Sequence, residues 1–114
     1  MTGLRRAKSF CSENNAKSKI GAGFIHMVIF QIKPQYVRTY KKDCRMWARY
    51  AGRARGFLKY STVKRVNAKN QYASVYQWES KIYHSRFMKA WHDKLVDRSH
   101  CPVKVVGYYN FVII

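Results

Sequence analysis

Acidic residues are scarce in this sequence. Its 114 residues include 23 Lys and Arg but only five Asp and Glu, which gives a formal net charge of +18 at pH 7. So few carboxylates leave almost no material for the paired acids of hydrolases or for magnesium-dependent chemistry. The excess of positive charge predicts attraction to polyanions, such as nucleic acid, anionic lipid or small anionic ligands, and does not choose among them.

Cysteine is also sparse, and several common motifs are missing. Cys11, Cys44 and Cys101 are an odd number at wide spacing, with no C-x-x-C pair. We therefore expect neither a disulfide scaffold nor a zinc site, and a reducing, cytoplasmic setting. No apolar run approaches the roughly 20 residues of a membrane-spanning helix. The sequence contains no nucleophile elbow, no phosphate-binding loop and no metal-spaced cluster, so we expect no bound metal.

What the chain does contain is enough hydrophobic material for a packed core. Hydrophobic residues make up 47% of the sequence and aromatic residues 16%, which excludes a disordered chain over most of its length. Residues 1–23 are different, because they are basic and lack a hydrophobic period. We interpret them as a basic, flexible tail, with an organelle transit peptide as the alternative, and residues 24–114 as one domain.

The hydrophobic pattern predicts six elements in the order β-α-β-β-α-β, a ferredoxin-like α+β arrangement. They are a strand at 24–32, a helix from Pro34 to Gly52, hairpin strands at 57–66 and 71–78, a helix capped by Ser80 that continues, kinked or broken, to Val96, and a strand at 103–114.

The first and last strands are apolar on both faces. In the first, Phe24 and Val28 alternate with Ile25 and Ile29, and in the last, strict alternation places Val105 with Tyr109 on one face. Two helices can cover only one face of a sheet, and an antiparallel sheet with a solvated face alternates more cleanly. We therefore expect a homodimer that packs sheet on sheet.

Several segments together resemble the antibiotic biosynthesis monooxygenase domain of the dimeric α/β-barrel superfamily, over residues 24–114. The run Trp78-Glu79-Ser80 at the end of the third strand is the most telling of them. The others are Val28–Pro34, Gly56–Leu58, Val75–Gln77, His84, Arg86–Phe87, Trp91–His92 and Pro102–Tyr109.

This resemblance implies a homodimer with a ligand pocket between the sheet and the helices of each protomer. Members include cofactor-free oxygenases of aromatic polyketides and haem-degrading enzymes, so the resemblance implies oxygenation or binding of a small aromatic or haem-like ligand. No cofactor is expected for the first class, and haem would be the cofactor of the second. A homodimer that only binds its ligand is the alternative.

The family's functional residues transfer in part. Haem-degrading members use a first-strand Asn, a third-strand Trp and a helical His. Trp78 matches the Trp, an ungapped register puts Met27 at the Asn, and His84 or His92 is offered for the His. The missing Asn argues against haem degradation. In the cofactor-free oxygenases the protein favours deprotonation of an acidic substrate and holds the carbanion beside oxygen.

Individual residues also have plainer interpretations. Trp78 and His84 are typical core or packing residues as well as catalytic candidates. His26 stands out, because a polar side chain on the apolar face of Phe24 and Val28 needs a partner or a pocket. We therefore predict His26, Trp78 and His84 as catalytic residues. The predicted substrate-binding residues are Tyr60, Tyr76, His92 and Asn110.

The basic charge supports a second hypothesis. Residues 38–69 hold eleven Lys or Arg and one acid, Asp43, and the first predicted helix carries a five-residue basic stripe. Aromatic residues interleaved with cations suit single-stranded nucleic acid, although no RNP-type run is present. We expect at most weak, non-specific contacts with phosphates, and a merely solvated helix face is the alternative.

Overall fold

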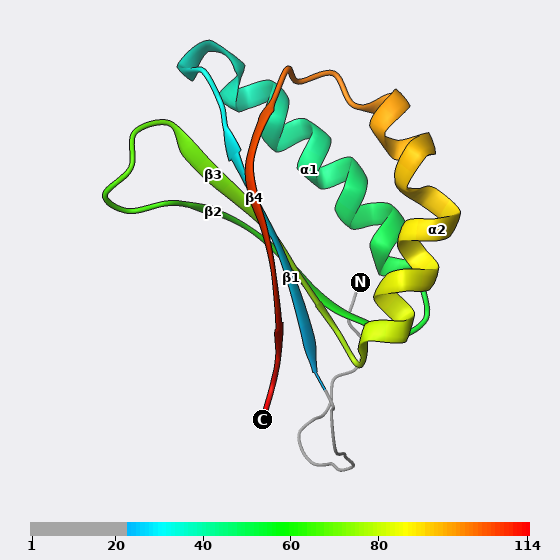
Figure 1. Cartoon of the computed structure of the whole chain (residues 1–114). Coiled ribbons are helices and arrows are strands. Elements are labelled where there is room, and N and C mark those ends of the chain that lie inside the picture. The colour runs from blue at the N-terminus through cyan, green and yellow to red at the C-terminus, as the bar shows by residue number, and fades with distance from the viewer. Residues whose placement is uncertain (1–22) are drawn as a thin grey trace.

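The computed structural model describes residues 23–114, which form a four-stranded antiparallel sheet with two α-helices on one face (Figure 1). The predicted tail lies outside the described residues, apart from Gly23. The strand order across the sheet is β2-β3-β1-β4, and the predicted ferredoxin-like α+β fold is confirmed. The elements are β1 (Phe24–Gln31), the 3-10 helix η1 (Pro34–Tyr36), α1 (Val37–Gly52), β2 (Phe57–Lys64), β3 (Gln71–Trp78), α2 (Lys81–Arg98) and β4 (Lys104–Val112).

β1 lies in the middle of the sheet and pairs with both β3 and β4 along its length. Because strand side chains alternate between the two faces, Phe24, His26 and Val28 share the face that the helices cover, and all three are buried. The residues between them lie on the opposite face. β1 therefore brings one polar side chain, His26, into an apolar layer.

α2 is one continuous helix from Lys81 to Arg98, so the break that was one of the predicted alternatives before Val96 does not occur. Phe87 and Leu95 are buried, and the half-buried Trp91 lies four residues from each of them. This spacing keeps one uninterrupted face toward the core. Ser80 occupies the N-cap position, as predicted, but its side chain makes no capping hydrogen bond.

The core consists of two hydrophobic clusters between the sheet and the helices. The larger is centred on Trp78, which has no exposed surface, and includes Phe24, Phe87 and Leu95. The smaller joins Ile32 to α1 through Tyr40 and Cys44. Trp78 therefore packs where β1, β3 and α2 meet.

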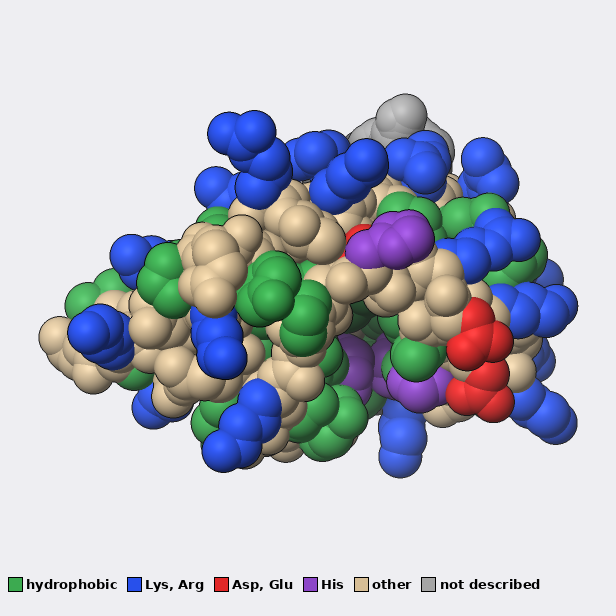
Figure 2. All heavy atoms as spheres, turned by 90° about the horizontal axis from the view of Figure 1, so that it is seen from above, with side chains coloured by type: hydrophobic (Ala, Val, Ile, Leu, Met, Phe, Trp, Pro, Cys, Tyr) green, Lys and Arg blue, Asp and Glu red, His purple; other side chains and the backbone are tan. Residues whose placement is uncertain are grey.

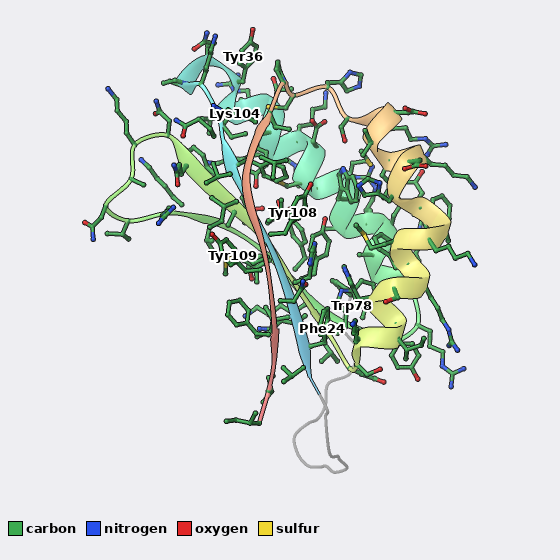
Figure 3. All side chains as sticks on the ribbon, viewed as in Figure 1. Phe24, Tyr36, Trp78, Lys104, Tyr108 and Tyr109 are labelled. Atoms are coloured by element: carbon green, nitrogen blue, oxygen red, sulfur yellow. The ribbon has the colours of Figure 1, made fainter. Side chains whose placement is uncertain are left out.

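β4 exposes large apolar side chains on both of its faces, as predicted. Figure 3 shows Tyr108 and Tyr109 on opposite sides of the strand, and their exposed fractions are 61% and 47%. One detail differs from strict alternation: a register shift opposite Ile29 and Phe30 pairs Val105 with Phe30, so Val105 does not share the face of Tyr109. Among the described residues no helix is long and apolar enough to cross a membrane.

Asp43 is the only acid of α1, and it is buried. Its Oδ2 accepts hydrogen bonds from the backbone N–H groups of His100 and Cys101, at 2.9 and 2.7 Å. A carboxylate that satisfies two backbone donors is a strong, charge-assisted contact. Asp43 thereby ties α1 to the loop that leads into β4.

The solvent face of α1 carries a row of cations, which we call the α1 stripe. Its members are exposed and recur at steps of three or four; they are Arg38, Lys41, Lys42, Arg45, Arg49 and the C-cap residue Arg53. Like charges four residues apart repel each other, and cations in the first turns oppose the helix dipole. The first turn holds no acid, and within residues 23–114 the single salt bridge joins His92 to Asp93. The repulsion along the stripe is therefore uncompensated.

We predict that Arg45→Glu stabilises the protein. The substitution converts two repulsive pairs, with Lys41 and Arg49, into attractive ones, each change being about 0.5 kcal/mol. The expected gain is about 1 kcal/mol, or about 4–8 °C in Tm for a domain of this size. Thermal unfolding followed by circular dichroism measures it. Lys89→Glu on α2 is the control, because it places an acid four residues before Asp93; an equal gain for both variants would contradict the repulsion argument.

Candidate functional site

His26 meets two polar or aromatic side chains across the sheet. In the β1 register it lies opposite Asn110 of β4 and Tyr76 of β3, so all three share the helix-covered face. Nδ1 of His26 lies 2.7 Å from Oδ1 of Asn110. Because this oxygen can only accept, His26 Nδ1 carries the proton and Nε2 presents its lone pair. Asn110 therefore fixes the tautomer of His26.

α2 places His84 directly against His26. The two imidazole centroids are 4.3 Å apart, with an interplanar angle of 35°. Phe24 and Trp78 flank His84, at centroid distances of 5.3 and 5.9 Å. We call His26, His84, Trp78 and Asn110 the histidine cluster. Figure 3 shows the labelled Phe24 and Trp78 close together between the sheet and α2.

Three ring nitrogens of the histidine cluster are buried without a hydrogen-bond partner among the described residues. They are His26 Nε2, His84 Nδ1 and Trp78 Nε1. Most buried polar atoms in proteins are paired, and an unpaired one costs about 1–3 kcal/mol. A site that concentrates three such atoms offers one donor, the indole N–H, and imidazole nitrogens to a bound molecule or to water.

Both imidazoles are held in the neutral form at pH 7. Burial lowers the pKa of His26, and the hydrogen bond to Asn110 opposes this shift in part. Burial, followed by repulsion from the neighbouring His26, lowers the pKa of His84 to about 4. Two imidazoles this close together repel each other when both are charged, so the pair takes up one proton at a time. The cluster can therefore act as a base that accepts a single proton.

The other predicted site residues lie at different distances from this cluster. Tyr76 is buried, and its ring centroid is 6.2 Å from that of His26. Tyr60 instead donates its hydroxyl to Ser74 Oγ, at 2.9 Å, and its ring packs against Tyr76. Tyr60 is therefore committed to a buried hydroxyl network, which Tyr40 joins through the same Ser74 oxygen.

His92 is not brought to the cluster. Its ring packs against Trp47, with centroids 6.0 Å apart, and its Nδ1 lies 3.0 Å from the neighbouring Asp93 carboxylate. It is exposed on α2. Of the two histidines offered for the family's helical His, the structure thus places His84 beside Trp78.

Met27, which the ungapped register puts at the family's first-strand Asn, does not face the histidine cluster. Met27 lies on the face of the sheet away from Trp78, because Phe24 and His26 share the helix face and Met27 follows His26 by one residue. The side chain that β1 contributes next to His84 is therefore His26. The amide of the cluster comes from β4, as Asn110.

Tyr108 is a neighbour of the cluster that the sequence did not single out. It lies two residues before Asn110 on the same face of β4, and its ring is nearly parallel to that of His26, at 6.3 Å and 23°. Two-residue spacing from Asn110 was the available signal. Figure 2 shows histidine side chains inside and beside a hollow in the surface. No group of three or more metal-ligating side chains occurs in residues 23–114.

Comparison with known proteins identifies the fold. No family model matches the chain, and no curated protein sequence matches it. The structure is similar to SnoaB, a cofactor-independent oxygenase from Streptomyces nogalater, with a TM-score of 0.62 and 12% identity over 82% of this chain and 94% of that one. A protein of unknown function from Bacteroides thetaiotaomicron, described as a possible oxidoreductase, gives a TM-score of 0.68 at 9% identity over 82% and 100% of the two chains. MupZ from Pseudomonas fluorescens gives 0.66 at 13% over 78% and 70%.

We predict that lowering the pH from 7 to 5 destabilises the protein through His84. An unfolded histidine takes up its proton near pH 6.5, whereas folded His84 does so only near pH 4, so the unfolded state binds more protons in between. Because His84 is only about half buried, solvent screening reduces the effect to about 1 kcal/mol. Urea unfolding at both pH values measures it. His84→Gln should remove about this amount of the pH dependence; a variant that loses as much stability between pH 7 and pH 5 as the wild type would contradict the assignment.

Proposed function

We propose that this protein is a homodimeric oxygenase of the antibiotic biosynthesis monooxygenase type. It oxygenates a small, acidic aromatic ligand at the histidine cluster, using molecular oxygen and no resident cofactor. The single observation that carries the proposal is the set of three unpartnered buried nitrogens on His26, His84 and Trp78. The shared fold with a cofactor-independent oxygenase gives it further support.

Oxygenation of the ligand requires one general base and a position for O₂ beside the carbanion. Nε2 of His26 takes a proton from an activated CH₂ group of the aromatic ligand, and Asn110 steadies the resulting imidazolium through Nδ1. The carbanion then transfers electrons to O₂, so that CH₂ and O₂ become C=O and H₂O. The ligand supplies all four electrons, and the proton held by His26 leaves with the water. No external reductant is needed.

The packing of the cluster favours a small ligand over haem. The rings of His26, Phe24 and Trp78 pack around His84 in tilted or edge-to-face contacts, at centroid distances of 4.3 to 5.9 Å, which leaves no slot for a macrocycle between them. A small aromatic ring can instead lie beside Tyr108, on the stretch of β4 that the helices leave uncovered.

Turnover of a probe substrate tests this proposal. With 1,8-dihydroxyanthrone as the probe and oxygen uptake as the readout, His26→Gln should lower kcat/KM by about 10²- to 10⁴-fold, the usual contribution of a general base. His92→Gln is the matched control and should keep the wild-type rate, because His92 lies outside the cluster. Wild-type turnover in His26→Gln would refute the assigned base. Probe binding without oxygen uptake by the wild type would show a ligand-binding protein instead.

Dimerisation through the open face of the sheet is part of the same proposal. Phe111, opposite Ile25 on that face, is 48% exposed, and it continues the apolar surface of Tyr109. We predict that Phe111→Glu converts the dimer to a monomer in native mass spectrometry. Ile82→Glu is the control, since Ile82 is 52% exposed but belongs to α2. A wild-type protein that is already monomeric would contradict the sheet-on-sheet dimer.

A further inference from the structure

Repulsion between the cations of the α1 stripe lowers the stability of the protein, and the fold does not require these cations. The sheet needs only the opposite face of α1, where Tyr40, Cys44 and Ala51 are buried. The stripe cations repel one another along the helix, and no acid among residues 23–114 forms a salt bridge with them. Local conflict of this kind is typical of binding surfaces, because a polyanion that docks there removes the repulsion.

At its C-terminal end the stripe runs into an apolar groove between the α1–β2 turn and α2. The groove holds about 170 Å³, and two exposed guanidinium groups flank its aromatic lining. A cavity of about 150 Å³ admits benzene, so a ring of that size fits here. The lining residues are Ala54, Arg55, Tyr83, Arg86, Phe87, Ala90 and Trp91.

Contacts between cations and aromatic rings connect the stripe to the groove. The Arg53 guanidinium lies 5.3 Å from the Tyr50 ring centroid, and Tyr50 contacts Trp91 of the groove, with centroids 4.9 Å apart. Within the groove, Arg55 and Arg86 both lie against Tyr83, at 5.8 and 5.9 Å. Cations and aromatic rings therefore form one continuous surface. Figure 2 shows how strongly Lys and Arg outnumber acids on the face in view.

We propose that this surface binds single-stranded nucleic acid, with the phosphodiester backbone along the α1 stripe and one base in the groove. Proteins that bind single strands combine a positively charged track with aromatic surfaces on which bases stack, and both parts are present here in series. A duplex would not fit as well, because its bases are already paired and cannot enter a groove. This surface lies on the solvent side of α1, so the proposal does not depend on oxygenase activity at the histidine cluster.

An anionic membrane fits this surface less well than a nucleic acid. Helices that lie on bilayers insert an apolar face between the lipids while their basic face remains at the headgroups. The apolar face of α1 is already buried against the sheet, through Tyr40 and Cys44. The stripe itself contains only cations on its exposed positions, which suits a backbone of phosphates.

Fluorescence anisotropy tests the proposal with the full chain and labelled 12-nucleotide oligouridine or oligothymidine at 150 mM salt. The stripe variant Lys41→Gln/Arg45→Gln/Arg49→Gln should bind at least ten-fold more weakly. Its slope of log K against log salt should fall by about 2, because three phosphate contacts are lost. The matched control is Lys59→Gln/Lys64→Gln/Lys69→Gln on the β2–β3 hairpin, which removes the same charge from exposed positions and should change affinity less than two-fold.

Equal losses in the two triple variants would overturn the proposal, since they would show attraction to the overall charge alone. Binding of the wild type to vesicles containing 30% phosphatidylserine, without binding to either oligonucleotide, would also overturn it in favour of a membrane. The circular dichroism melting curve of the stripe variant checks its folding, and the melting temperature should not fall.

The groove has its own test. An oligonucleotide with abasic sites should bind the wild type about ten-fold more weakly than the intact one, because stacking of bases is lost. Arg86→Gln should reduce this difference, since it removes one of the two guanidinium groups that flank the groove. Equal binding of intact and abasic strands by the wild type would overturn the role of the groove.

Discussion

The pairing of β1 with both of its neighbours is the constraint on which the rest of this structure depends. Its register with β3 and β4 puts Tyr76 and Asn110 on either side of His26, on the face that the helices cover. A shift of one residue in the β1–β4 pairing would send Asn110 to the far side of the sheet and leave Nδ1 of His26 without its acceptor. The same register sets Trp78 opposite Phe24, and His84 of α2 packs against both of these rings.

Burial then determines what the cluster can do. In water a histidine near neutral pH is divided between its charged and neutral forms. Burial lowers the pKa of both His26 and His84, and repulsion from His26 lowers that of His84 further. A neutral imidazole with a fixed tautomer is a competent base without further activation. No carboxylate is needed to hold the two imidazoles in the neutral form. Asp93, for example, contacts His92 and lies outside the histidine cluster.

The fold could be predicted from the sequence because each element has its own hydrophobic period and is bounded by residues that end helices and strands, such as the proline after β1 and Pro102. That His26 would need a polar partner or a pocket was also predictable, since its polar side chain lies on an apolar strand face. The association of His26 with His84 was not, because a strand and a helix 58 positions apart in sequence meet only through tertiary packing. Local patterns likewise could not separate His84 from His92, which lie on one helix, nor reveal the register shift that redirects the start of β4.

The position of Asp43 affects both the histidine cluster and the α1 stripe. Asp43 could have relieved the repulsion of the α1 stripe, yet it turns inward and accepts the N–H groups of His100 and Cys101. This contact holds the loop that starts β4, and β4 carries Asn110 and Tyr108 to the histidine cluster. One carboxylate therefore supports the neutral site on one side of α1 and leaves the cations on the other side uncompensated. Because the stripe lies on the side of α1 that faces away from the sheet, α1 presents positive charge to solvent without placing that charge beside the imidazoles.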